Sequence, residues 1–210
     1  MRVDRLVSAS LALLFLACSR EEITGGRQAS EPGVRKERVE LRVDDAVLSG
    51  DDAFAIIEPV YWSANIYDSL QEYEASLQSF SRPQRLLNAL HWYIAEVNNG
   101  GHDQFYANST GIVWPDALAA FEAIGVPDGA EIIRESTERL GGPPSREREE
   151  RNRQLEQLEA DFEDLDNRFY ALQEQVNLDA KMLEYARRQS TEFHFAGVVE
   201  RTALSQPPVP

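Results

Sequence analysis

The feature that most restricts the fold of this chain is helical spacing of its apolar residues between about residues 51 and 195. One clear example has apolar side chains at i, i+1, i+4, i+8 and i+11: Leu86, Leu87, Leu90, Ile94 and Val97. Glycine and proline separate this segment from others like it, and no convincing sheet pattern is visible. The sequence therefore predicts an all-α domain over 51–195, folded as a compact multi-helix bundle.

The last periodic segment predicts a long C-terminal amphipathic helix. Its apolar residues are spaced alternately by three and four positions: Leu155, Leu158, Phe162, Leu165, Phe169, Leu172 and Val176. This heptad spacing is typical of a coiled-coil seam and also of the buried stripe of a bundle helix. Two phenylalanines in a short seam, and the neighbouring amphipathic segments, favour the bundle helix.

The N-terminus has the pattern of an export signal. Arg2 and Arg5 precede an apolar run, 6–16, which is well short of the roughly 20 residues that a membrane-spanning helix needs. The run ends in Leu16-Ala17-Cys18, which resembles the lipobox of bacterial lipoproteins, although Phe15 stands where that family usually has leucine. The resemblance implies that residues 1–17 are a lipoprotein signal peptide and that Cys18 is lipidated. We therefore expect a lipid-anchored protein of the bacterial cell envelope, with its domain outside the cytoplasm.

The regions on either side of the helical domain are predicted to lack regular structure. Residues 18–50 are rich in glycine, proline and charge, which is typical of a flexible tether behind the lipidated cysteine. Val39, Leu41 and Val43 alternate with polar residues, a weak signal for one short strand. Residues 196–210 end in Gln-Pro-Pro-Val-Pro and predict a Pro-rich disordered tail.

The charge of the chain excludes some partners and indicates another. With 36 acidic and 21 basic residues the net charge is −15, so direct binding to nucleic acid is not expected. Residues 58–195 alone carry 25 acidic and 12 basic side chains. A run without a basic residue is the candidate interaction surface for an unknown protein with a basic surface: Glu156, Glu159, Asp161, Glu163, Asp164 and Asp166. A solvated outer helix face is the simpler interpretation.

Catalytic and metal-binding patterns are weak. No phosphate-binding loop, nucleophile motif or metal-ligand spacing occurs in the sequence, so we expect no enzyme activity, no cofactor and no metal. His91 lies beside an apolar face and is expected to pack there. His102 and Asp103 form the one pair suited to acid–base work, which leaves an uncharacterised hydrolase-like activity as an alternative.

The most distinctive stretch spans residues 96–111. Its notable members are Glu96, Asn98, Asn99, Gly100, Gly101, Asp103, Gln104, Phe105, Asn108 and Gly111. The double glycine predicts the end of a helix, and the amide side chains are suited to pairing with backbone groups in the loop that follows. The sequence thus predicts an inter-helix connection locked by amides, with Phe105 packed inward. A recognition loop is the functional alternative.

This stretch, with Leu165–Tyr170 and Tyr185…Phe193, resembles the signature of the DMP-type DNA-mimic proteins, a domain of unknown function. The resemblance implies an all-α fold, a homodimer, and surface carboxylates that imitate DNA phosphates and occupy a DNA-binding transcription regulator. A lipoprotein's domain lies outside the cytoplasm, where such a regulator is absent. The leading hypothesis is therefore a membrane-anchored, non-catalytic, acidic binding domain, and an intracellular DNA mimic is the alternative.

Overall fold

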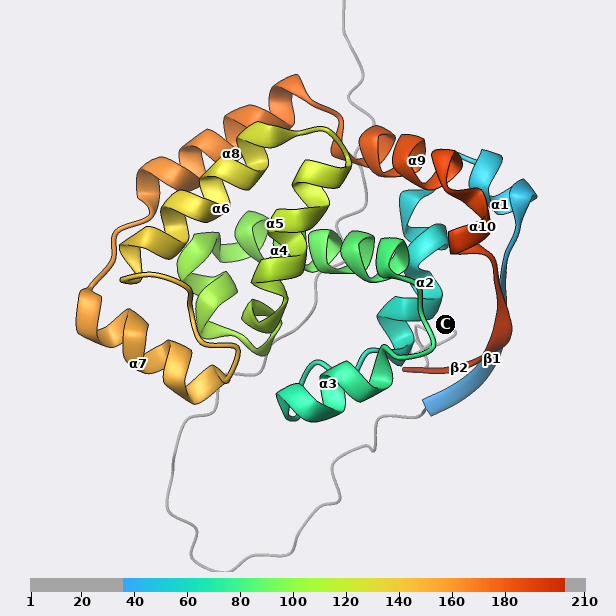
Figure 1. Ribbon diagram of the computed structural model, residues 1–210, viewed down its shortest axis with the longest axis horizontal. Helices are drawn as coiled ribbons and strands as arrows, with labels where there is room; N and C mark the ends of the chain where they lie inside the picture. Colours follow the sequence, from blue (N-terminus) through green and yellow to red (C-terminus); the bar gives the residue numbers. More distant parts are fainter. Residues whose placement is uncertain (1–35, 203–210) are drawn as a thin grey trace, which may run out of the picture. The chain divides into compact units, whose positions relative to one another are not determined.

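The computed structural model describes residues 36–202, in which α-helices predominate (Figure 1). The elements are β1 (Lys36–Val43), α1 (Asp45–Ser49), α2 (Ala53–Ser63), α3 (Leu70–Ser76), α4 (Arg82–Ala107), the 3-10 helix η1 (Ser109–Val113), α5 (Trp114–Ala123), α6 (Pro127–Arg139), α7 (Arg148–Leu158), α8 (Glu163–Gln175), α9 (Leu178–Arg188), α10 (Ser190–Phe193) and β2 (Phe195–Thr202). The predicted helical class is confirmed, with one two-stranded sheet added to it. None of the helices in this described part is long and apolar enough to cross a membrane.

Helix α4 is the central element, because α2, α5, α7 and α8 all contact it. Its start is fixed by residues close in sequence: Ser81 and Gln84 form a reciprocal capping box, and Pro83 lies in the first turn. Tyr93, in the middle of α4, is fully buried. Its ring meets those of Phe105, Phe121 and Phe169 edge-on at 5.0, 5.6 and 5.2 Å between centroids. This aromatic cluster joins α4, α5 and α8 into one core.

The prediction of one long C-terminal helix from the heptad spacing is wrong, because the helix is interrupted between α7 and α8. Glu159 ends α7 in the left-handed conformation, with φ of 45°. The carbonyl of Asp161 accepts from Arg139 of α6 (2.6 Å), while its side chain accepts from the N–H of Glu163 at the start of α8 (3.0 Å). The break lets α7 pack against α4 and α8 pack against α6. One continuous helix could not make both contacts.

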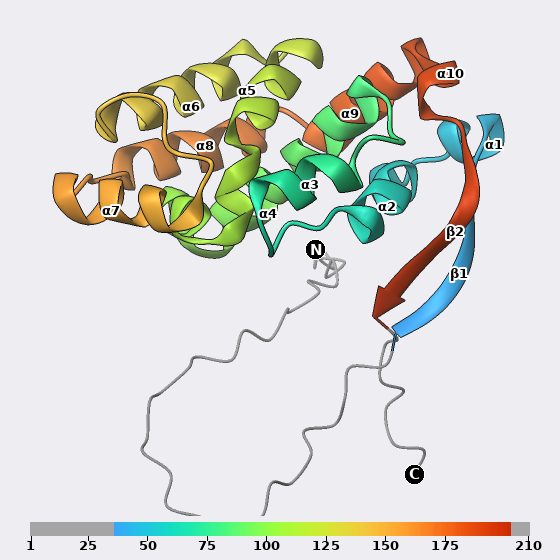
Figure 2. The same ribbon diagram turned by 60° about the horizontal axis from the view of Figure 1, so that its bottom comes forward.

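A two-stranded ribbon corrects the predicted boundaries of the domain. Strand β1 pairs with β2 in antiparallel register, with Val39 opposite Val199 (Figure 2). The predicted tether is therefore wrong for residues 36–49, and the predicted tail is wrong for residues 196–202. The two strands are about 160 residues apart, so no local pattern shows that each supplies the other's hydrogen bonds. The signal peptide, Cys18 and the rest of the tether and tail lie outside the described residues.

Candidate functional site

The double glycine kinks α4 instead of ending it. Gly100 and Gly101 leave helical geometry, with φ of −162° and +72°, and the chain then resumes as helix to Ala107. The double glycine therefore interrupts the helix where the sequence predicts its end, but the predicted loop after it is wrong. A Cβ on Gly101 would overlap the carboxylate of Asp166 from α8, so glycine is needed both for the φ angle and for the close approach of α8.

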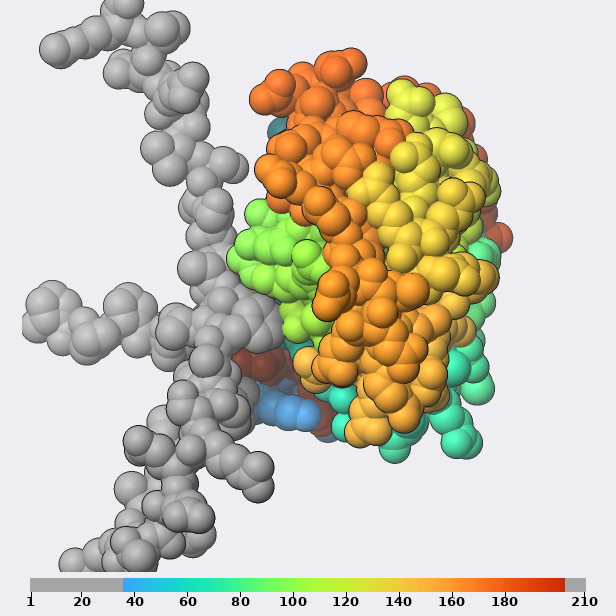
Figure 3. Space-filling model, turned by 90° about the vertical axis from the view of Figure 1, so that its left-hand side faces the viewer, coloured from blue at the N-terminus to red at the C-terminus, as the bar shows by residue number. Residues whose placement is uncertain are grey.

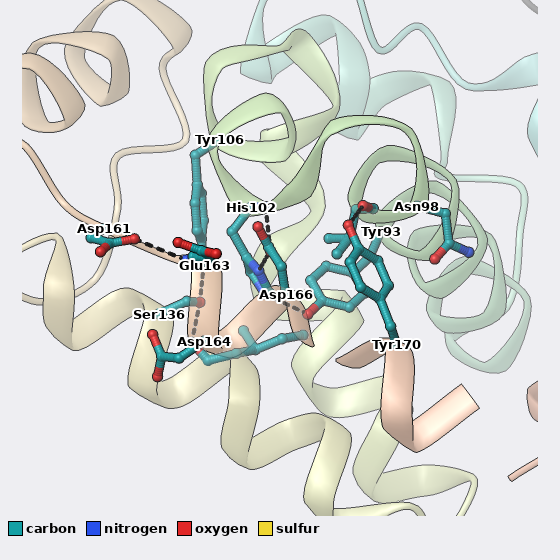
Figure 4. Close-up of polar contacts among 12 residues, drawn as sticks. Tyr93, Asn98, His102, Tyr106, Ser136, Asp161, Glu163, Asp164, Asp166 and Tyr170 are labelled. Atoms are coloured by element: carbon teal, nitrogen blue, oxygen red, sulfur yellow. Dashed lines mark hydrogen bonds and ion pairs between the residues drawn. The ribbon is translucent and has the colours of Figure 1, made fainter. Parts of the chain in front are cut away.

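His102, the first residue after the kink, is fully buried and bonded on both sides of its ring (Figure 4). Its ring Nδ1 and backbone N lie 2.5 and 2.9 Å from Asp166 Oδ1. The Tyr93 hydroxyl lies 2.8 Å from Nε2. Because a carboxylate accepts, Nδ1 donates to Asp166, and in the neutral ring Nε2 then accepts from the Tyr93 hydroxyl. The expected His102–Asp103 pair is therefore wrong, since Asp166 is the partner of His102.

Glu96 lies one helical turn before the kink and binds polar side chains that follow it. Its carboxylate is 5% exposed and accepts three side-chain hydrogen bonds. Gln104 Nε2 and Asn108 Nδ2 donate to Oε2 at 2.7 and 2.9 Å, and the Thr110 hydroxyl donates to Oε1 at 2.7 Å. The amides therefore bond a buried carboxylate across the kink, rather than the backbone groups expected from sequence. This set of contacts ties the two halves of α4 to η1.

Arg151 of α7 completes this junction, and no pattern in the sequence indicates its role. The side chain is fully buried, with no carboxylate among its hydrogen-bond partners in residues 36–202. Its guanidinium donates to four backbone carbonyls: those of Tyr106, Asn108, Ser145 and Arg146, at 2.6 to 3.2 Å. Burial lowers the pKa of Arg151 to about 10, which leaves it protonated at neutral pH. A positive charge at the C-terminal end of α4 is favourable because the carbonyls there have no helical partner.

The remaining motif residues divide between interior and surface. Phe105 is fully buried, as predicted. Gly111 is also buried, and a Cβ there would overlap the Arg151 side chain, so the close packing requires glycine. Asn98 exchanges two hydrogen bonds with Gln173 of α8, at 2.9 and 2.8 Å. Asn99 and Asp103 are exposed. Most of the motif therefore holds the kink of α4 against α7, α8 and η1, and only its exposed members are free to contact a partner.

The acidic run predicted as one helix ridge is divided by the structure. Asp166 points inward to His102, and Asp164 accepts two hydrogen bonds from the Arg139 guanidinium, which lower the pKa of Asp164 to about 2. Glu156, Glu159 and Glu163 do not form a ridge on one helix, because α7 ends before Glu159. Asp166 is therefore engaged with His102. The Asp164 side chain is 61% exposed, but its charge is paired with Arg139, so we leave both residues out of the candidate surface.

The other four residues remain exposed and gain a neighbour from α4. Glu156, Glu159, Asp161 and Glu163 form no ion pair with any side chain of residues 36–202. Burial raises the pKa of Asp103 of α4, and the negative charges of Asp166 and Asp161 raise it further. Figure 3 shows α7 and α8 in orange across this side, with the green end of α4 next to them. We call these five residues the acidic face: Asp103, Glu156, Glu159, Asp161 and Glu163.

Metal and acid–base chemistry find little support at this site. Within residues 36–202 no group of three or more His, Cys, Asp or Glu side chains is placed to hold a metal ion. The His102 ring has no exposure to solvent, and both of its nitrogens are engaged. A substrate would have to displace the core to reach it. His91 packs against Phe54 and Tyr61, as predicted, with burial lowering its pKa to about 4.

The fold and these contacts define a small, mostly helical domain with a hydrogen-bonded kink in its central helix and an acidic outer face. More specifically, the chain belongs to the DMP19-like protein family, whose model matches residues 78–189. The matched region includes α4 to α9, and therefore the kink and the acidic face. No curated protein and no solved structure matches the chain. The ribbon, α1, α2 and α3 lie outside the family match.

Proposed function

We propose that this chain is a membrane-anchored, non-catalytic binding protein whose acidic face recognises a basic surface on another protein. The observation that carries the proposal is the acidic face itself. Four of its five carboxylates lie within eight residues of one another, at the corner between α7 and α8. Exposed carboxylates that form no ion pair repel one another, and a basic partner relieves that repulsion.

The hydrogen bonds behind this face support a role in recognition. Asp164 and Asp166 of α8 are held by Arg139 and His102, so the backbone that carries Asp161 and Glu163 is fixed from behind. A rigid set of charges loses little conformational entropy on binding. The face is therefore suited to long-range attraction and to specific docking.

The membrane anchor is proposed from the N-terminal sequence, and cell fractionation tests it. The wild-type chain is expected in the membrane fraction, and the Cys18→Ala chain is expected to lose acylation and leave that fraction. Ser19→Ala is the matched control, because it changes the neighbouring residue and keeps the thiol. Recovery of wild-type protein in the soluble fraction, or a Cys18→Ala chain that stays with the membrane, would contradict the anchor.

The partner is tested by crosslinking in intact cells followed by mass spectrometry. A variant with Glu156→Gln, Glu159→Gln, Asp161→Asn and Glu163→Gln is expected to lose the specific crosslinked partner. A control neutralises four exposed carboxylates elsewhere that have no ion pair within residues 36–202: Glu40, Asp51, Glu138 and Glu192. If the position of the carboxylates matters, the control variant still crosslinks to the specific partner. Equal loss from both variants would instead indicate non-specific charge attraction.

An intracellular DNA mimic is the second candidate, and membership of the DMP19-like family favours it. In this case the acidic face takes the place of DNA phosphates on a DNA-binding transcription regulator. Two results together distinguish the candidates: the location of the chain, and whether added chain displaces DNA from the crosslinked partner. A soluble chain that displaces DNA supports the mimic. A membrane-bound chain whose partner does not bind DNA excludes it.

A further inference from the structure

A second recognition feature lies apart from the acidic face, where α8 ends and α9 begins beside α4. A groove of about 560 Å³ is formed there by two residues of α4 and by the segment 173–179. Its floor includes the reciprocal amide pair of Asn98 and Gln173, whose two hydrogen bonds of 2.9 and 2.8 Å fix both side chains. The groove is thus built on a rigid element of the fold.

The groove has the electrostatic character of a cation site. Its lining includes the carboxylates of Glu174 and Asp179 and no Lys, Arg or His side chain. Neither carboxylate forms an ion pair within residues 36–202. The last turn of α8 also contains no basic residue, and its final carbonyls point toward the end of the helix. The negative end of the helix dipole adds to the two charges.

The groove also offers apolar contact beside these charges. Ile94, Val176 and Leu178 contribute to its lining. Tyr170 lies three and four residues before Gln173 and Glu174 on α8, and therefore on the same face of the helix. Its hydroxyl donates to the Val97 carbonyl (3.0 Å), which lays the ring over α4, and 39% of the side chain remains exposed.

We propose that this groove receives an arginine side chain of the partner protein. The methylene stem packs on Ile94, Val176 and Leu178, while the guanidinium donates to Glu174 and Asp179 beside the end of α8. A guanidinium suits the groove better than an ammonium, because its planar donors match carboxylates in pairs. The inference rests on the proposed function, because it gives the basic partner a defined anchor residue.

The test is an NMR titration of the full chain, labelled with nitrogen-15, with N-acetyl-arginine amide. The side-chain amide signals of Asn98 and Gln173 are expected to shift and saturate. N-acetyl-citrulline amide has nearly the same shape without the charge, and is expected to cause no saturable shift. The Glu174→Gln/Asp179→Asn variant is expected to bind the arginine probe about fivefold or more weakly.

A matched variant, Glu156→Gln/Glu163→Gln, removes the same number of charges from the acidic face and leaves the groove unchanged. It is expected to bind the arginine probe as the wild-type chain does. Equal shifts with citrulline, undiminished binding to the groove variant, or equal weakening in both variants would overturn the proposal. The titration uses no protein partner, so it fails or succeeds independently of the acidic face.

Discussion

The positive charge of Arg151 lies in the interior, where the guanidinium donates hydrogen bonds only to backbone carbonyl oxygens. Replacement by alanine leaves four carbonyls without their donor, so Arg151→Ala is expected to lower the free energy of unfolding by about 3 kcal/mol. Arg153 is the matched control, because it lies two residues away, is 61% exposed and pairs with Glu150. Arg153→Ala is expected to change stability by less than about 0.5 kcal/mol. Urea denaturation measures both, and equal effects would contradict the structural role of Arg151.

His91 makes the fold sensitive to mild acid. Burial lowers its pKa to about 4 in the folded chain, against an ordinary value of 6.5, so the unfolded chain binds more protons between these two pH values. Stability from this group is complete above pH 6.5 and falls as the pH drops toward 4, by about 2 kcal/mol between pH 7 and pH 5. His91→Gln is expected to remove that part of the pH dependence. A variant with the wild-type pH profile in urea denaturation would contradict this.

At the scale of the elements, the kink of α4 depends on a residue without a side chain. Gly101→Ala is expected to destabilise the fold by about 3 kcal/mol, because the positive φ and the overlap with Asp166 add together. Gly125 has a similar φ of 75° and open space around it. Gly125→Ala should therefore cost only about 1 kcal/mol. Thermal unfolding distinguishes the two, and equal losses would mean that the close approach of α8 has little weight.

The break between α7 and α8 offers a stabilising substitution. Glu159 is the one non-glycine residue with positive φ within residues 36–202. Glu159→Gly is expected to raise stability by about 0.5 to 1 kcal/mol, because glycine adopts this conformation without steric cost. Glu159→Gln is the control that removes the charge and keeps the side chain. If both variants gain equally in urea denaturation, charge repulsion accounts for the gain.

Helix α4 and the divided helix α7–α8 show which features the sequence can and cannot predict. The start of α4 was predictable, because Ser81, Pro83 and Gln84 act on backbone groups within one turn. The division of the last helix was not, because the spacing from Leu155 to Val176 persists through the break. The break is fixed by Arg139, which is distant in sequence. The alternation of Val39, Leu41 and Val43 indicated the strand β1, but its pairing with β2 escaped prediction because the two strands are far apart in sequence.

At the scale of the whole molecule, the sequence located the excess of negative charge but not its arrangement. The sequence correctly identifies four exposed carboxylates: Glu156, Glu159, Asp161 and Glu163. Asp164 and Asp166 were assigned to the same surface, because the sequence does not show that α6 supplies Arg139 and that the α4 kink supplies His102. Asp103 comes from α4, far from the other four members in sequence, so spacing along the chain does not group it with them.

The most direct test of the central claim is the dissociation constant of the complex with the purified crosslinked partner, measured as a function of salt concentration. For the wild-type chain we predict affinity that falls at least about tenfold between about 50 and 400 mM NaCl. The variant neutralised at Glu156, Glu159, Asp161 and Glu163 should bind weakly, with little dependence on salt. The variant neutralised at four other carboxylates should behave as wild type. Tight binding that is independent of salt, or unchanged in the first variant, would contradict recognition through the acidic face.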